Sequence, residues 1–256
     1  MTRASLDRLG RIAREAGAEI QHVRQALQGR QVPRVHDVKA DGSPVTEADR
    51  AAHRVILAAL AAWNPDIPVV SEEGAIPSYD ARRTWRRFWL VDPLDGTREF
   101  LGPTGEYTVN IALIEDDAPV MGVVFAPALD LLYLAGRGLG AWKQEGAAAP
   151  RRIFSAPAPE GAPLVVAESR SHPSAELEAF LATVPVSRRV RAGSSLKFCW
   201  VAEGTADIYP RFGRTMEWDT AAGDCVYRQS GRNGERSSPL RYNTPALAHE
   251  RFVIGR

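Results

Sequence analysis

The sequence predicts a mixed α+β fold, and three observations lead to this prediction. Apolar residues recur at three- and four-residue steps from Leu6 to Leu27, which is the period of an amphipathic helix. Short apolar runs rich in β-branched and aromatic residues occupy the middle of the chain and are typical of strands. The second half alternates strand-like and helix-like segments, a pattern that predicts helices layered on sheets.

The first half is expected to form two helices followed by strands. The first helix runs from Leu6 to Leu27. After a polar turn at Lys39–Pro44, a second helix runs from Thr46 to Trp63, where Asn64 and Pro65 end it. We predict strands at 67–70, 88–91, 107–114, 120–125 and 131–134. The spacing of the last three predicts antiparallel neighbours.

The second half is expected to alternate its elements. Strands are predicted at 164–167, 186–190 and 206–209, and helices at 174–183, 195–204 and 219–229. A stretch rich in Ala, Pro and Gly, from Gln144 to Pro163, is predicted to link two lobes of one catalytic domain. We place an α+β lobe at 1–150 and an α/β lobe at 151–256.

Composition and charge exclude several classes of partner. The chain has 256 residues, 45% of them hydrophobic, and a net charge of +1, which gives no broad reason to expect nucleic acid. The longest apolar run, Val55–Trp63, is too short to span a bilayer. We therefore expect a cytoplasmic protein without stable membrane insertion, with Cys199 and Cys225 as free thiols. Peripheral contact with the inner membrane stays open, as does the choice between monomer and homodimer.

Carboxylates gather where predicted strands and helices end or begin. Glu72 follows one apolar run, Asp92 and Asp95 follow the next, and Asp219 lies at a helix start. The spacing of Asp92 and Asp95 allows both carboxylates and the Leu94 carbonyl oxygen to face one point. An all-oxygen ligand set of this kind suits Mg²⁺ or Mn²⁺ better than Zn²⁺.

Gly96 and Thr97 come directly after these acids and begin a predicted short helix. The start of a helix offers backbone N–H groups to an anion. Metal ligands beside such donors are the recurring apparatus of phosphoryl transfer. The residues themselves therefore favour metal-assisted phosphate chemistry.

The order of three acidic motifs resembles the inositol monophosphatase superfamily, a group of lithium-sensitive, magnesium-dependent phosphatases. The motifs are Glu72-Glu73, Asp92-Pro-Leu-Asp-Gly-Thr97 and Trp218-Asp219. A finer resemblance is to the CysQ-type 3'(2'),5'-bisphosphate nucleotidases, and it fades after Asp224. The segments that carry it are Lys39–Thr46, Asp95–Phe100, Gly105–Ala112, Ser169–His172, Gly193–Phe198, Val201–Gly204 and Tyr209–Gly213.

The resemblance implies a layered α-β-α-β-α sandwich of the inositol monophosphatase and fructose-1,6-bisphosphatase type. It also implies two or three Mg²⁺ ions, replaceable by Mn²⁺. Asp92 would join Glu72 and the Leu94 carbonyl at one metal, and Asp95 and Asp219 at another. Asp49 and Thr97 would activate the attacking water. The substrate-side residues would be Glu72, Leu94, Asp95, Gly96, Thr97, Ser169, His172, Gly193, Lys197 and Asp219.

The activity that the resemblance implies is hydrolysis of a small bisphosphate nucleotide. Adenosine 3',5'-bisphosphate would give AMP and phosphate, and its sulfated analogue PAPS would give APS and phosphate. One alternative is a phosphatase for inositol 1-phosphate or a sugar phosphate that uses the same metals. Another is a catalytically silent protein that binds metal and nucleotide.

Several of these residues also fit structural roles. Asp49 suits the acid of a capping box, and Asp219 suits a helix N-cap. Glu73 fits a solvated or supporting role as well as a direct one. His172 fits a surface loop, and Lys197 fits a solvated helix position.

Overall fold

The computed structural model describes residues 1–28, 37–38, 44–45, 47–171 and 174–255. Both helices predicted in the first half are confirmed, as α1 (Arg3–Gln28) and α2 (Glu47–Trp63). The predicted cap Thr46 and most of the polar turn lie outside the described residues. Two short strands, β1 (Asp37–Val38) and β2 (Pro44–Val45), pair antiparallel beside that turn.

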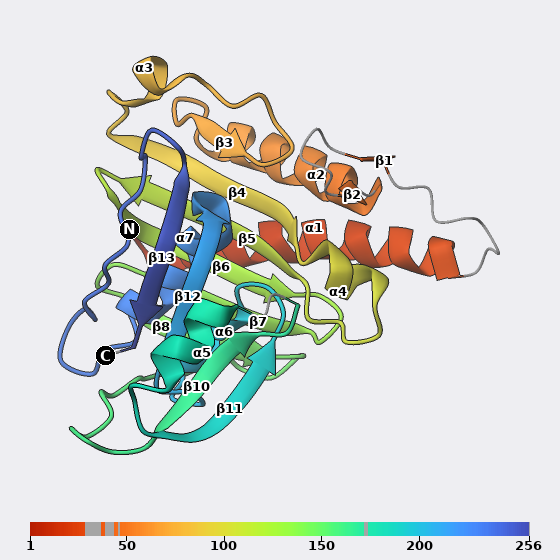
Figure 1. Ribbon diagram of the computed structural model, residues 1–256. Coiled ribbons are helices and arrows are strands. Elements are labelled where there is room, and N and C mark those ends of the chain that lie inside the picture. Colours follow the sequence, from red (N-terminus) through yellow and green to blue (C-terminus); the bar gives the residue numbers. More distant parts are fainter. Residues whose placement is uncertain (29–36, 39–43, 46, 172–173, 256) are drawn as a thin grey trace.

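The elements stack in five alternating layers (Figure 1). Helices α1 and α2 cover one face of a seven-stranded sheet. Helices α6 (Leu196–Ala202) and α7 (Glu217–Arg228) cover the other face. A second group of strands and then α5 (Ala175–Leu181) complete the stack. The predicted α-β-α-β-α order is thus confirmed.

The large sheet has the order β3-β4-β5-β6-β7-β8-β9. Strands β3 and β4 are parallel, and every later pair is antiparallel, which confirms the predicted antiparallel neighbours. The strands are β3 (Val69–Ser71), β4 (Arg87–Asp95), β5 (Thr108–Glu115), β6 (Ala118–Ala126), β7 (Leu131–Gly136), β8 (Gly140–Glu145) and β9 (Arg151–Ile153).

The sheet corrects two sequence predictions. The segment from Gln144 to Pro163 is not all linker, because β8 and β9 pair with each other and extend the large sheet. The strand predicted at 88–91 continues to Asp95, so Asp92 and Asp95 lie within β4 rather than after it. The lobe boundary at residue 150 stays a prediction.

Close packing on both faces holds this sheet. On the α1 and α2 side, Trp89 is fully buried, and its ring centroid lies 5.7 Å from that of Trp63. On the other side, a Cβ added to Gly122 would lie 2.8 Å from the Cβ of Cys225, so β6 and α7 approach closely. Burying a large apolar side chain contributes about 1.5–3 kcal/mol. The strand ends that carry the acids are therefore set on a rigid support.

The second group of strands comes from the C-terminal half. Strands β10 (Leu164–Ser169) and β11 (Val186–Ala192) are parallel, and β12 (Tyr209–Met216) and β13 (Ala248–Ile254) are antiparallel. A bridge between Val166 and Ile208 joins the two pairs. Strand β13 was not predicted, and β12 begins where the predicted strand ends. The short helices α3 (Tyr79–Arg82) and α4 (Thr97–Leu101) lie in the first half.

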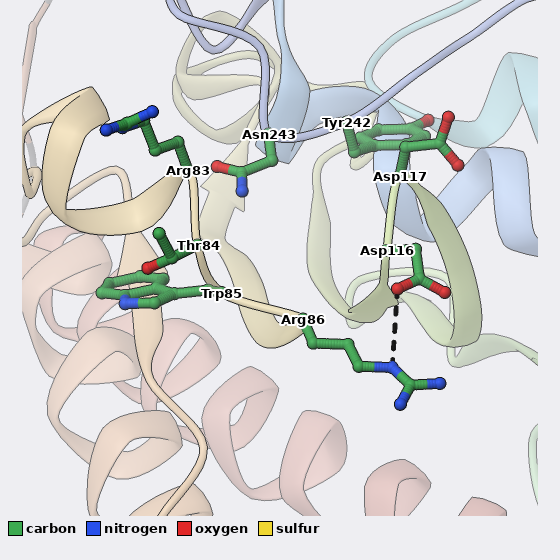
Figure 2. A pocket seen from close by; sticks show the side chains of 8 residues that line it. All are labelled: Arg83, Thr84, Trp85, Arg86, Asp116, Asp117, Tyr242 and Asn243. Atoms are coloured by element: carbon green, nitrogen blue, oxygen red, sulfur yellow. Dashed lines mark ion pairs between the residues drawn. The ribbon is translucent and has the colours of Figure 1, made fainter.

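A hollow of about 500 Å³ lies where β4 begins, at the opposite end of this strand from Asp95 (Figure 2). Two of its lining residues, Arg86 and Asp116, form an ion pair, with 3.5 Å between the Arg86 Nε and the Asp116 Oδ1. Its lining residues are Arg83, Thr84, Trp85, Arg86, Asp116, Asp117, Tyr242 and Asn243. Among the described residues, no helix has the length and apolar character needed to cross a membrane.

Candidate active site

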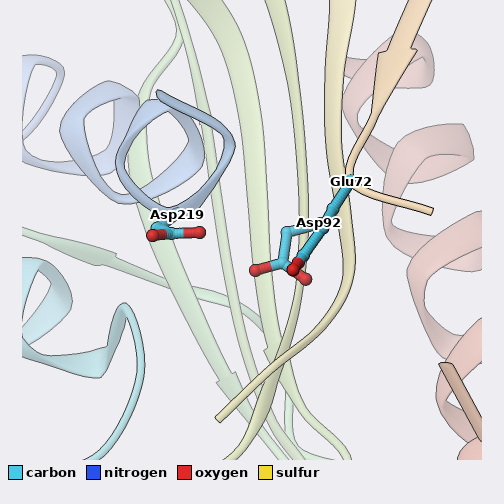
Figure 3. Close-up of side chains that lie close together, drawn as sticks. All are labelled: Glu72, Asp92 and Asp219. Atoms are coloured by element: carbon cyan, nitrogen blue, oxygen red, sulfur yellow. The ribbon is translucent and has the colours of Figure 1, made fainter. Parts of the chain in front are cut away.

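Three carboxylates from separate segments converge in front of the large sheet (Figure 3). Glu72 directly follows β3, Asp92 lies in β4, and Asp219 lies in the first turn of α7. One carboxylate oxygen of each lies within 4.8 Å of those of the other two. The Glu72 N–H donates to the Val91 carbonyl oxygen at 3.1 Å, so the parallel pairing of β3 and β4 brings Glu72 beside Asp92.

Burial and the charges of neighbouring acids disfavour the charged forms of Asp92 and Asp219. Asp92 is 1% exposed, and burial, followed by the charges of Glu72 and Asp95, raises its pKa well above the ordinary value. Burial and then the Asp95 charge also raise the pKa of Asp219 well above its usual range. A divalent cation would remove this repulsion, and oxygen-only donors suit Mg²⁺ or Mn²⁺. The residues present therefore fit a divalent metal.

An irregularity within β4 shapes the acidic motif. The pairing of β4 with β5 shifts between Asp92 and Asp95, where Pro93 supplies no N–H to the ladder. The Asp92 Oδ1 accepts the Leu94 N–H at 3.0 Å, which fixes the direction of that carboxylate. The predicted role of the Leu94 carbonyl oxygen as a metal ligand stays a prediction.

Asp95 is expected to destabilise the metal-free protein as pH rises from 5 to 7.5. Burial raises the pKa of Asp95 to about 6, although Lys197 acts in the opposite direction. Between the ordinary value and pH 6, the folded state therefore binds more protons than the unfolded chain, and unfolding becomes easier as pH rises. The penalty is absent at low pH and complete above pH 6. Burial lowers the pKa of His249 to about 4, which acts in the opposite direction over part of this range, so the contribution of Asp95 is the difference between the wild type and Asp95→Asn. We expect that difference to be about 3 °C in the unfolding temperature.

Two comparisons test this pH dependence. Asp95→Asn should show a smaller downward shift, because one of the raised groups no longer titrates. Added Mg²⁺ should stabilise the protein more at pH 7.5 than at pH 5, because protons compete with the metal for carboxylates. Identical pH profiles for the wild type and Asp95→Asn would contradict the assignment.

The turn after Asp95 packs against a loop from the second half of the chain. Gly96 caps α4 with a φ of +90°, and a Cβ added there would overlap the Ser194 Oγ. That oxygen lies 2.8 Å from the Asp95 carbonyl oxygen and 2.7 Å from the Glu106 carbonyl oxygen. Thr97 begins α4, as predicted. Ser194 thus ties the acidic motif to the C-terminal half.

Asp49 belongs to α2 and lies near the acids of this site. It is 2% exposed in the first turn of that helix, and its charge is one of the causes that raise the pKa of Asp92. One turn later, the His53 Nδ1 lies 2.9 Å from the Ser71 Oγ, next to Glu72. His53 was not predicted, although its place four residues after Asp49 puts both on one helix face.

The predicted substrate-side residues of the C-terminal half meet near β11. The Gly193 N–H donates to the Glu106 carboxylate at 2.9 Å. The Lys197 ammonium donates to the Ala192 and Ser194 carbonyl oxygens, and burial lowers its pKa to about 8. Both residues thus hold the 192–195 loop, and their substrate contacts stay predictions.

Ser169 ends β10 and pairs in register with Ala192, so it lies beside that loop. His172 lies outside the described residues. Two further residues beside this loop, Arg170 and Glu106, were not predicted. The Arg170 guanidinium donates twice to the Glu106 carboxylate, at 2.9 Å in each case. The two residues are far apart in the sequence, and no local pattern predicts such a pair.

Comparisons with known proteins show the family of this chain. The model of the inositol monophosphatase family matches residues 6–236. The chain is 46% identical, over 239 residues, to the 3'(2'),5'-bisphosphate nucleotidase CysQ of Shigella flexneri, and the match covers 93% of each chain. The crystal structure of CysQ from Bacteroides thetaiotaomicron has a TM-score of 0.76 and 38% identity, and the match covers 95% of this chain and 94% of that one.

A more distant relative has the same fold. The native crystal structure of the extragenic suppressor protein suhB from Bartonella henselae has a TM-score of 0.72 and 28% identity, covering 89% of this chain and 85% of that one. The family match spans both the N-terminal acids and Asp219. This protein belongs to the inositol monophosphatase family.

Proposed function

We propose that this protein is a Mg²⁺-dependent 3'(2'),5'-bisphosphate nucleotidase that hydrolyses adenosine 3',5'-bisphosphate to AMP and phosphate. The observation that carries the proposal is the convergence of Glu72, Asp92 and Asp219 on one point. The relatives named CysQ, 46% identical over 93% of the chain in one case, support the nucleotide as substrate class. The sulfated analogue PAPS would be a second substrate.

Two or three Mg²⁺ ions would be held by the acids of both halves. Asp92 would bind one metal with Glu72 and the Leu94 carbonyl oxygen, and a second with Asp95 and Asp219. When bound, the metals would polarise the phosphoryl group, lower the pKa of a water and neutralise charge on the leaving oxygen. Mn²⁺ has the same preference for oxygen ligands and would replace Mg²⁺.

The protein's own groups would handle the proton and the substrate's orientation. Thr97 and Asp49 together would take a proton from the attacking water. The water oxygen would form a bond to phosphorus while the ester P–O bond breaks, and the leaving ribose oxygen would take up a proton from solvent water. Gly96 would lie beside this phosphoryl group. Ser169, His172, Gly193 and Lys197 would form the nucleotide side of the site.

Phosphate release distinguishes this activity from an inositol phosphatase. With Mg²⁺ present, adenosine 3',5'-bisphosphate and inositol 1-phosphate are compared side by side over a range of concentrations. We expect kcat/KM for the nucleotide to be at least about a hundredfold higher, because polar groups built for one substrate stay unpaired with the other. Adenosine 5'-monophosphate serves as the control, since it lacks the 3'-phosphate.

Two outcomes would contradict the proposal in different ways. Preference for inositol 1-phosphate would retain the metal chemistry and overturn the substrate class. Tight binding of the bisphosphate without phosphate release would favour a catalytically silent binding protein.

A further inference from the structure

The three converging carboxylates come from two distant parts of the chain. Glu72 and Asp92 lie on either side of the connection between β3 and β4, which contains α3. Asp219 arrives separately, on α7. A metal ion held by all three therefore depends on how the start of α7 is placed against that connection.

The first residue of α7, Glu217, is a fully buried carboxylate held by a loop near the C-terminus. Its Oε2 accepts the Asn243 N–H at 2.7 Å. Its Oε1 accepts the Thr244 N–H at 2.8 Å and the Thr244 hydroxyl at 2.6 Å. The Glu217 N–H donates to the Leu247 carbonyl oxygen at 2.8 Å. Two backbone N–H groups and one hydroxyl of the loop thus converge on one buried carboxylate, so this loop fixes the helix start.

Arg82, the last residue of α3, holds the same loop from the other side. Its guanidinium donates to the Asn243 Oδ1 at 2.8 Å and to the Pro245 carbonyl oxygen at 2.7 Å. The Asn243 Nδ2 donates back to the Arg82 carbonyl oxygen at 2.8 Å. Arg82 is 2% exposed, and Asn243 has a φ of +65°, which asparagine adopts more readily than most residues.

We propose that Arg82, Asn243 and Glu217 form a clasp that positions Asp219 for metal binding. The clasp begins in the connection between the two other carboxylates and ends two residues before Asp219. The Asp219 Oδ2 also accepts the Met216 N–H at 3.0 Å. This bond ties the direction of the Asp219 carboxylate to the position of the first turn of α7. Glu217 and Arg82 are therefore positioning residues, and the inference rests on the metal site of the proposed function.

Direct titration with Mn²⁺, without substrate, tests the clasp. In Glu217→Gln, the amide N–H₂ group would face the Asn243 N–H, a donor against a donor. We expect the Mn²⁺ concentration at half-saturation to rise about tenfold in calorimetry, because one strong bond of the clasp is lost. Asn243→Gly keeps the positive φ and removes both bonds to Arg82, and it should show a similar rise.

Asp224→Asn is the matched control on the same helix. Asp224 is fully buried and accepts bonds from the Arg228 Nε at 2.8 Å and the Tyr242 hydroxyl at 3.0 Å. Its loss should lower the unfolding temperature of the metal-free protein. The Mn²⁺ concentration at half-saturation should stay within about twofold of the wild type, because the amide oxygen of asparagine can still accept the Tyr242 hydroxyl and so leave the neighbouring Asn243 in place.

The outcomes separate the clasp from the function on which it rests. Wild-type Mn²⁺ affinity in both Glu217→Gln and Asn243→Gly would overturn the clasp alone. An equal loss of affinity in Asp224→Asn would also overturn it, because any loosening of α7 would then suffice. A wild-type protein that binds no Mn²⁺ at millimolar concentration would overturn the proposed metal site itself. If Glu217→Gln does not fold, Asn243→Gly decides the question.

Discussion

Asp92→Asn is expected to lower the rate of phosphate release by at least about a thousandfold while leaving the fold intact. Loss of a carboxylate shared by two metals removes several kcal/mol of transition-state stabilisation, and each ~1.4 kcal/mol is a factor of ten in rate. The amide oxygen of the substituted side chain can still accept the Leu94 N–H that the carboxylate now accepts. The metal-free variant should therefore unfold at an equal or higher temperature, because one buried charge among several acids is gone.

The combination of lost activity and retained stability is what identifies a metal ligand. Asp224→Asn offers the opposite combination, since that buried carboxylate pairs with Arg228. Breaking a buried pair is strongly destabilising, by about 3–5 kcal/mol, but Asp224 lies outside the acidic trio. Its turnover per folded molecule should stay near that of the wild type. Near-normal turnover in Asp92→Asn, measured at saturating Mg²⁺, would remove Asp92 from the proposed metal site.

Elements with a strong pattern of their own were predictable. Helices α1 and α2 follow an apolar period that only a helix satisfies, and both ends of α2 are marked by local signals. Strands β4 to β7 are buried apolar runs. Strand β8 has mostly half-buried or exposed residues beyond Ala141, and β9 begins with two exposed arginines. Pairing with a neighbour, rather than their own pattern, makes these segments strands.

The residues of the site also divide into those that were predictable from the sequence and those that were not. Glu72, Asp92 and Asp219 were predictable because acids at strand ends and helix starts are visible in the sequence, and the family resemblance ordered them. The role of Glu217 was not predicted. Its role depends on a loop that begins at Asn243, in a segment that the resemblance did not reach, although the family match continues to residue 236. Such long-range bonds between a carboxylate and backbone N–H groups leave no periodic trace.

Gly96→Ala is expected to lower turnover by at least about a hundredfold and to destabilise the protein. The backbone there has a φ of +90°, where a Cβ costs about 1–2 kcal/mol, and the added Cβ would overlap the Ser194 Oγ. Ser194 must then move, and it contacts the carbonyl oxygen of Asp95. A displacement of about 1 Å at a reacting centre is enough for this loss of rate.

Gly138→Ala separates the backbone strain from the overlap with Ser194, because Gly138 has a φ of +76° and nothing within 4 Å of an added Cβ. It should lose stability to a similar backbone cost and keep its turnover. Adding Ser194→Gly to Gly96→Ala removes the clashing hydroxyl, and glycine suits the φ of +52° at that position. Partial recovery of turnover in the double variant would assign the loss to the displaced Ser194. Equal effects of Gly96→Ala and Gly138→Ala on kcat would instead show that the contact between the two halves does not place Asp95.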